Sequence, residues 1–113
     1  MLECLRACMR LKPTRIVVGE VGGAEAHTLL KAWNTGHPGG MATVHANDAV
    51  SGLVRLESLV AEATSAPQQT LIAEAVDVVI FVDEEPQLAA GRKVREVLLV
   101  TGYSDGKYTV EHV

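Results

Sequence analysis

The chain has 113 residues, a formal net charge of −4 at pH 7 and a hydrophobic content of 48%. That length suits a single domain with a packed core. The acidic balance argues against a bare nucleic-acid-binding domain, which usually carries a basic stripe, so we expect no direct sequence-specific binding of nucleic acid.

The first part of the chain predicts two helices, each followed by a strand. Apolar side chains at helical spacing predict a helix over residues 2–11, which Pro13 ends because the residue before a proline avoids helical geometry. The β-branched run over residues 15–20 predicts a strand buried on both faces, as in a parallel sheet. A helix over residues 24–35 then leads through a glycine-rich turn into a strand over residues 41–45.

The rest of the chain predicts two more helices, a third strand and a terminal hairpin. Ser51 can cap a helix whose apolar stripe extends to Ala63, and a short helix covers about residues 67–75. Residues 76–82 form a third, mostly apolar strand. The hairpin would join residues 93–100 to residues 107–110 through Ser104-Asp105-Gly106.

Cysteine usage and hydropathy predict a soluble, cytoplasmic protein. Cys4 and Cys8 lie one helical turn apart, and free thiols of this kind fit a reducing cytosol. No apolar run reaches the ~18 residues that a membrane span needs. Glu3 and Arg6 interrupt the first ten residues, which therefore do not resemble the apolar centre of a signal peptide.

Strands that alternate with helices predict an α/β fold with a mainly parallel sheet flanked by helices. Ligands of such sheets bind beyond the carboxyl ends of the strands. The first predicted strand ends at Glu20 and the second ends at His45, followed by Asn47 and Asp48. We therefore expect these polar side chains to line one crevice.

Glu20 and His45 are the candidate catalytic residues. A carboxylate directly after an apolar strand can orient water or hold a magnesium ion through water, and Gly19 beside it lets a ligand approach the backbone. An imidazole at a strand end can transfer a proton or bind phosphate near neutral pH. A solvated acid and a hydrogen-bonded histidine are the alternatives that the local pattern leaves open.

Other residues give weaker signals. His37 lies in the turn and could reach the crevice edge, and Arg55 could contact a phosphate or a neighbouring subunit, or be an exposed helical arginine. A metal site built from Glu20, His37, His45 and Asp48 matches no compact ligand spacing, so no metal site is expected. The phosphate-binding pattern G-x-x-x-x-G-K-[ST] does not occur in these 113 residues.

Two linked motifs carry a family resemblance. RACMRLKPTRIVVGEV, residues 6–21, resembles the Walker B region of the type II/type IV secretion ATPases, and AWNTGHPGGMATVHAN, residues 32–47, resembles their histidine box. The residues of the two motifs are most similar to those of the TrbB-type conjugal transfer ATPases, and the resemblance covers roughly residues 2–100. The arginine that usually follows Gly-Glu-Val in the family is replaced by Gly22, which removes a guanidinium able to grip a phosphate.

The resemblance implies a RecA-like P-loop NTPase fold that hydrolyses ATP with Mg²⁺. It implies a homo-hexamer, or assembly with a full-length homologue, that works with the conjugation or secretion machinery at the cytoplasmic side of the inner membrane. By this resemblance Glu20 is the catalytic Walker B glutamate, His45 faces the γ-phosphate, and Gly19, His37 and Arg55 lie at the nucleotide. Residues 1–113 would form the C-terminal part of the motor domain, with the Walker A half and the N-terminal domain absent.

Three functions therefore compete. The first is a fragment of an ATPase for conjugal DNA transfer, type IV secretion and pilus assembly, weak or inactive alone because it has no phosphate loop. The second is a non-catalytic module that assembles with full-length homologues through an apolar surface. The third is a small metal hydrolase.

Overall fold

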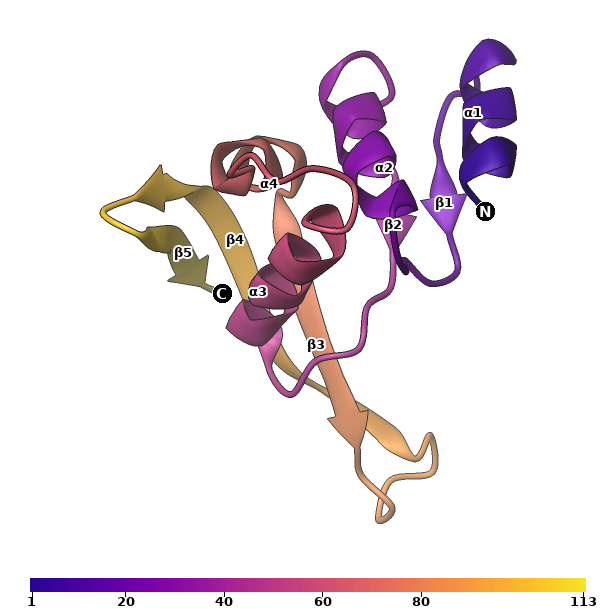
Figure 1. The fold of residues 1–113 in the computed structure, drawn as a ribbon. Coiled ribbons are helices and arrows are strands. Elements are labelled where there is room, and N and C mark those ends of the chain that lie inside the picture. The colour runs from indigo at the N-terminus through magenta and orange to yellow at the C-terminus, as the bar shows by residue number, and fades with distance from the viewer.

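The computed structural model describes residues 1–113 and shows helices alternating with strands before two terminal hairpins (Figure 1). The helices are α1 (Leu2–Arg10), α2 (Glu25–Asn34), α3 (Ala49–Val60) and α4 (Gln69–Ala75). The strands are β1 (Val17–Val18), β2 (Met41–Ala42), β3 (Val78–Glu84), β4 (Arg92–Ser104) and β5 (Lys107–His112). None of the helices has the length and apolar character needed to cross a bilayer.

The strands form two separate sheets. β1 and β2 pair in parallel, with Val17 opposite Met41 and Val18 opposite Ala42, whereas β3, β4 and β5 form an antiparallel sheet in that order. The expectation of a mainly parallel sheet is therefore wrong. The apolar run of β3 indicated burial but not direction, and the short connection from β3 to β4 can join only antiparallel neighbours.

The terminal hairpin is confirmed and extends further than its pattern indicated. β4 and β5 pair from Leu98–His112 to Ser104–Lys107, and Asp105 and Gly106 make the turn with φ angles of 53° and 76°. Two consecutive residues with positive φ give a turn whose twist matches that of the flanking strands. Asp105-Gly106 is therefore the sequence signal that sets this register.

β1 and β2 have one buried and one open face. Val18 is buried at 7% exposure, whereas Val17 is 64% exposed and Met41, its register partner, is 65% exposed. The prediction that the first strand is buried on both faces is therefore wrong, because no element of this chain covers the side on which Val17 and Met41 lie.

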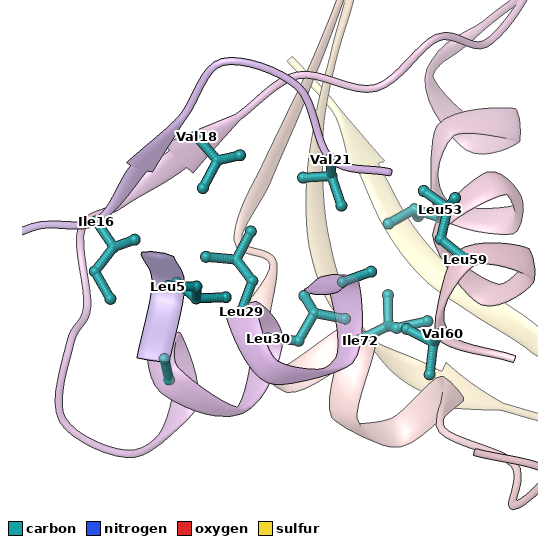
Figure 2. Close-up of a cluster of buried hydrophobic side chains, with 12 residues drawn as sticks. Leu5, Ile16, Val18, Val21, Leu29, Leu30, Leu53, Leu59, Val60 and Ile72 are labelled. Carbon is teal, nitrogen blue, oxygen red and sulfur yellow. The ribbon is translucent and has the colours of Figure 1, made fainter. Parts of the chain in front are cut away.

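The core lies between the helices and one face of each sheet. Its buried side chains include Leu5 of α1, Leu29 and Leu30 of α2, Leu53 and Val60 of α3 and Ile72 of α4 (Figure 2). Helix α3 packs against both sheets: a Cβ added to Gly52 would lie 4.0 Å from Val44, which follows β2, and 3.9 Å from Val79 of β3. The apolar stripe of α3 ends at Val60, and Ala63 is exposed beyond it.

The side of the antiparallel sheet away from the helices is apolar and uncovered. Residues that oppose one another in register share a face, and Val78–Leu99, Ile80–Val97 and Val82–Val94 are such pairs. We call this surface the outer sheet face. It consists of Val78, Ile80, Val82, Val94, Val97 and Leu99, of which all but Val97 are between 38% and 57% exposed.

Candidate functional site

The carboxyl ends of β1 and β2 are held together beyond the last paired residues. The Val21 backbone N–H donates to the Thr43 carbonyl at 2.9 Å, and the Thr43 hydroxyl donates to the Gly19 carbonyl. These bonds lie beyond Val18 and Ala42, where the paired register ends. They bring the backbones that carry Glu20 and His45 side by side.

The amino ends of the same two strands are joined by side chains. The Ile16 carbonyl accepts from the Met41 N–H and from the Trp33 indole N–H, each at 3.3 Å. The Arg15 guanidinium donates to the Gly39 carbonyl at 2.8 Å. Gly40 passes so close to Trp33 and Ile16 that a Cβ there would overlap the indole and the carbonyl. The glycines before β2 therefore allow a close approach of two backbones.

Glu20 and His45 form a direct pair at the carboxyl ends of the strands. His45 Nε2 lies 2.8 Å from Glu20 Oε1, and the two side chains are 91% and 58% exposed, respectively. A pair this exposed adds little to folding stability. The two groups lie together beyond the strand ends, as expected, and both are open to solvent.

Gly19 leaves open space beside this pair. No atom beyond its chain neighbours lies within 4 Å of the position that a Cβ would take. Its backbone does not need glycine for a positive φ, because Gly19 is not among the residues with that conformation. The free space could therefore accommodate a ligand atom against the backbone.

Neither His37 nor Arg55 makes a hydrogen bond or ion pair with Glu20 or His45. His37 Nδ1 is 3.3 Å from the Pro13 carbonyl, at the amino ends of the strands. Arg55 is exposed on α3 and makes no hydrogen bond or ion pair. Their contacts with nucleotide stay predictions. No three His, Cys, Asp or Glu side chains converge on one point, so the metal-hydrolase alternative lacks a ligand set.

Asp48, not Ser51, caps helix α3. Asp48 Oδ1 accepts from the Ser51 backbone N–H at 2.7 Å. This bond, with help from the Ser51 hydroxyl and the Val50 N–H, lowers the pKa of Asp48. Asp48 is therefore engaged in capping α3, while Asn47 beside it is exposed and makes no side-chain hydrogen bond.

Gly22 lies where the resemblance led us to expect an arginine. Its backbone N–H donates to Glu25 Oε1 at 3.0 Å, and Gly23 follows with φ of 65°. The two glycines thus form a tight turn into α2, and the Glu25 carboxylate satisfies one backbone donor before the helix begins.

Two residues of this region were missed by the sequence analysis. The Thr43 hydroxyl ties β2 to the Gly19 carbonyl, and Glu96 of β4 accepts from the backbone N–H of Ala49 at 3.2 Å. Thr43 could have been noted as the polar residue two positions before His45. Glu96 is 47 residues from Ala49, and nothing in the local sequence signals such a contact.

Comparison with known proteins decides the family. The model of the type II/IV secretion system protein family matches residues 1–98. The chain belongs to the type II/IV secretion system protein family. The probable conjugal transfer protein TrbB of Sinorhizobium fredii is 50% identical over 98% of this chain, which spans 33% of that relative. The conjugal transfer protein TrbB of Rhizobium radiobacter is 50% identical over 99% of the chain, which spans 34% of it.

The secretion-family fold is also found in a solved structure. The VirB11 ATPase from the Brucella suis type IV secretion system, in complex with sulphate, superposes with a TM-score of 0.77 at 31% identity. The match covers 87% of this chain and 31% of that one. This member of the family therefore has an α/β ATPase fold, and the resemblance seen in its motifs is confirmed.

Proposed function

We propose that this chain provides the water-activating and phosphate-sensing half of an ATP-hydrolysing site in a TrbB-like conjugation or type IV secretion ATPase. The observation that carries the proposal is the 2.8 Å pair of Glu20 and His45 at the carboxyl ends of two parallel strands. The match to a VirB11 ATPase supports the same activity. RecA-like strand ends are where nucleotide phosphates would meet these side chains.

Each side chain has a defined task in this proposal. Phosphoryl transfer depends mostly on positioning and on charge stabilisation, so Glu20 orients the attacking water and His45 donates a hydrogen bond to the terminal phosphate. His45 Nε2, which now faces Glu20, is the nitrogen that would turn to the phosphate. That exchange would free Glu20 Oε1 to accept a hydrogen bond from water.

The residues present fit magnesium and ATP in part. Mg²⁺ favours carboxylate oxygens and retained waters, and Glu20 offers a 58% exposed carboxylate whose second oxygen has no hydrogen-bond partner. The ion would neutralise charge on the phosphates when bound. The open space at Gly19 leaves room beside the carboxylate. Nucleotide affinity depends on a phosphate loop outside these 113 residues, since the motif does not occur among them.

The direct test places this chain in a full-length context. A full-length TrbB-type relative carries the 113 residues in place of its equivalent segment, and ATP turnover is measured with and without Glu20→Gln. General-base and water-positioning groups contribute about 10²–10⁴-fold, so we expect turnover to fall at least ~100-fold with little change in KM. Glu111→Gln, a solvent-exposed glutamate of β5, is the matched control. Turnover that survives Glu20→Gln would refute the proposal.

His45→Ala in the same chimera separates the two roles. We expect a loss of roughly tenfold or more in turnover, because a hydrogen bond to a phosphate oxygen that strengthens in the transition state is removed. The isolated chain should hydrolyse ATP at background rates. Turnover above background in the isolated chain that Glu20→Gln abolishes would contradict this dependence on an external phosphate loop.

The family resemblance supports further proposals on assembly. The parent protein would form a homo-hexamer at the cytoplasmic side of the inner membrane, and these residues would be the C-terminal part of its RecA-like motor domain. Arg55, exposed on α3 without a partner, would then reach a phosphate or a neighbouring subunit. Sedimentation of the chimera with and without Arg55→Ala tests the subunit contact.

A second candidate function is supported by the uncovered apolar surfaces. The outer sheet face and the Val17–Met41 side of β1 and β2 are both exposed. We propose as the alternative that they bind the remainder of a longer homologue, so that the chain joins or blocks its ring. Mixing the chain with a full-length TrbB-type relative should then lower ATP turnover and give co-sedimentation. A clean monomer that leaves turnover unchanged would exclude this module.

A further inference from the structure

We propose that Glu96 is a positioning residue for His45, acting through the start of helix α3. The inference rests on the role proposed above for His45. Glu96 lies on β4 of the antiparallel sheet, yet its Oε1 accepts from the backbone N–H of Ala49, the first residue of α3, at 3.2 Å. Glu96 of the antiparallel sheet thereby holds the segment that carries His45, which follows β2 of the parallel sheet.

The bond to Glu96 satisfies a donor that the helix itself cannot. The first backbone N–H groups of a helix have no partner within it, and Ala49 is only 1% exposed. Asp48 already accepts a hydrogen bond from the Ser51 N–H, and Glu96 accepts one from the Ala49 N–H, so two of these donors are satisfied by side chains. A carboxylate is also favoured here by the positive end of the helix dipole.

The geometry links this donor to His45. The segment from Thr43 to Ala49 is held at both ends: Thr43 bonds to Gly19 and Val21, and Ala49 bonds to Glu96. His45 lies between these attachments and is 91% exposed, with Glu20 as its one polar partner. Little packing holds the ring, so its position follows from the backbone on either side.

The surroundings of Glu96 hold its carboxylate in place. Glu96 faces the helices, in register with Phe81 of β3, and its side chain is 29% exposed. His112 Nε2 of β5 lies 4.0 Å from its second oxygen, Oε2. Glu96 is therefore the side chain that connects the antiparallel sheet to the backbone leading to the Glu20–His45 pair.

The experiment follows the pair itself by NMR in the labelled 113-residue chain. Two quantities are measured: amide exchange of Ala49, and the nuclear Overhauser effect between the His45 ring and the Glu20 side chain. In Glu96→Ala we expect Ala49 exchange to become about tenfold faster, as loss of a hydrogen bond to a charged group would give, and the His45–Glu20 signal to fall by about half or more. Glu111→Ala, on the opposite face of the sheet, should change neither.

Graded variants keep the test decisive. Glu96→Gln keeps an oxygen acceptor and should restore both signals, whereas Glu96→Asp is one methylene shorter and should lose both, even if the alanine variant fails to fold. If Glu96→Ala speeds Ala49 exchange but leaves the His45–Glu20 signal unchanged, Glu96 is only a structural cap and the proposal is overturned. Unchanged Ala49 exchange in Glu96→Ala would also overturn it. The NMR experiment uses no nucleotide, so its outcome does not depend on ATP hydrolysis. The proposed function is refuted separately, if turnover of the chimera is insensitive to His45→Ala.

Discussion

The two sheets of this chain are built in different ways. β1 and β2 pair through two residues each, yet their carboxyl ends hold Glu20 and His45 within 2.8 Å. β3, β4 and β5 form long antiparallel ladders, yet their outer sheet face is uncovered. The short sheet is aligned by hydrogen bonds from Arg15, Trp33 and Thr43. Two side chains of a candidate site can therefore be brought together without a long ladder of strand pairing.

The largest loss of stability is expected in helix α3, which packs against both sheets. Leu53 of α3 is fully buried in the core, so Leu53→Ala should lower the free energy of unfolding by about 2–5 kcal/mol. Urea denaturation at neutral pH measures this loss. Val54→Ala, next in sequence but 51% exposed, is the matched control and should cost far less. Equal losses would mean that α3 does not pack as described.

A substitution before β2 tests whether the two sheets unfold independently. Gly40→Ala places a methyl group against the Trp33 indole and the Ile16 carbonyl, so we expect a loss of about 1–3 kcal/mol. Hydrogen exchange should show faster exchange of the Met41 amide, while amides of β3 and β4 keep their protection. Gly19→Ala enters open space and should leave the fold unchanged. Loss of protection in both sheets would show that they unfold as one unit.

A smaller effect is expected where β5 contacts α3. The Tyr108 hydroxyl donates to Glu57 Oε1 at 2.6 Å, so Tyr108→Phe should cost about 1.5 kcal/mol, as hydrogen bonds to charged groups do. Tyr103→Phe is the control, because its hydroxyl has no hydrogen-bond partner although its ring packs edge-on against Tyr108.

The same bond predicts a pH dependence. Burial, followed by the bond to Glu57, raises the pKa of Tyr108 above its ordinary value of 10.0. A group whose pKa is raised by folding stabilises the fold fully below its unfolded pKa and loses that effect as pH rises toward the folded value. The difference between wild type and Tyr108→Phe should therefore be constant from neutral pH up to about pH 10 and shrink above it. A difference that grows at alkaline pH would contradict the contact.

The smallest effect on stability is expected on the outer sheet face. Ile80 is 57% exposed, so Ile80→Ser should change the free energy of unfolding by about 0.5 kcal/mol or less. We nevertheless expect the wild-type chain to self-associate in sedimentation, because a contiguous apolar patch promotes association, and Ile80→Ser to weaken it. Self-association that is unchanged by Ile80→Ser would indicate that another surface is responsible.

Much of the fold was predictable from local patterns. Breakers and apolar spacing identified every helix, and Asp105-Gly106 identified the terminal hairpin. The direction of β3 was not predictable in the same way, because an apolar run says nothing of the strand's neighbours, and one apolar face of β3 is in fact uncovered. The cap of α3 was assigned to Ser51 although Asp48, three residues earlier, holds that place.

The candidate site was predictable to the extent that it follows from strand ends. Glu20 and His45 meet because they follow the two strands of one parallel pair, two residues after Val18 and three residues after Ala42. His37 could not be placed from its sequence position, since the turn before β2 directs it toward Pro13. The contact of Glu96 with Ala49 depends on how one sheet lies against a helix, which no local pattern encodes.

The register of β4 has a consequence for how motion spreads through the chain. Residues 92–99 pair with β3 and residues 98–104 pair with β5, so only Leu98 and Leu99 have partners on both sides. Most of the antiparallel sheet is thus a two-stranded ribbon, which is marginally stable without cover. We expect the end of this ribbon beyond the register shift, where Val82–Glu84 pair with Arg92–Val94, to fray as a semi-independent arm, while Glu96 and Leu98 stay held against the helices.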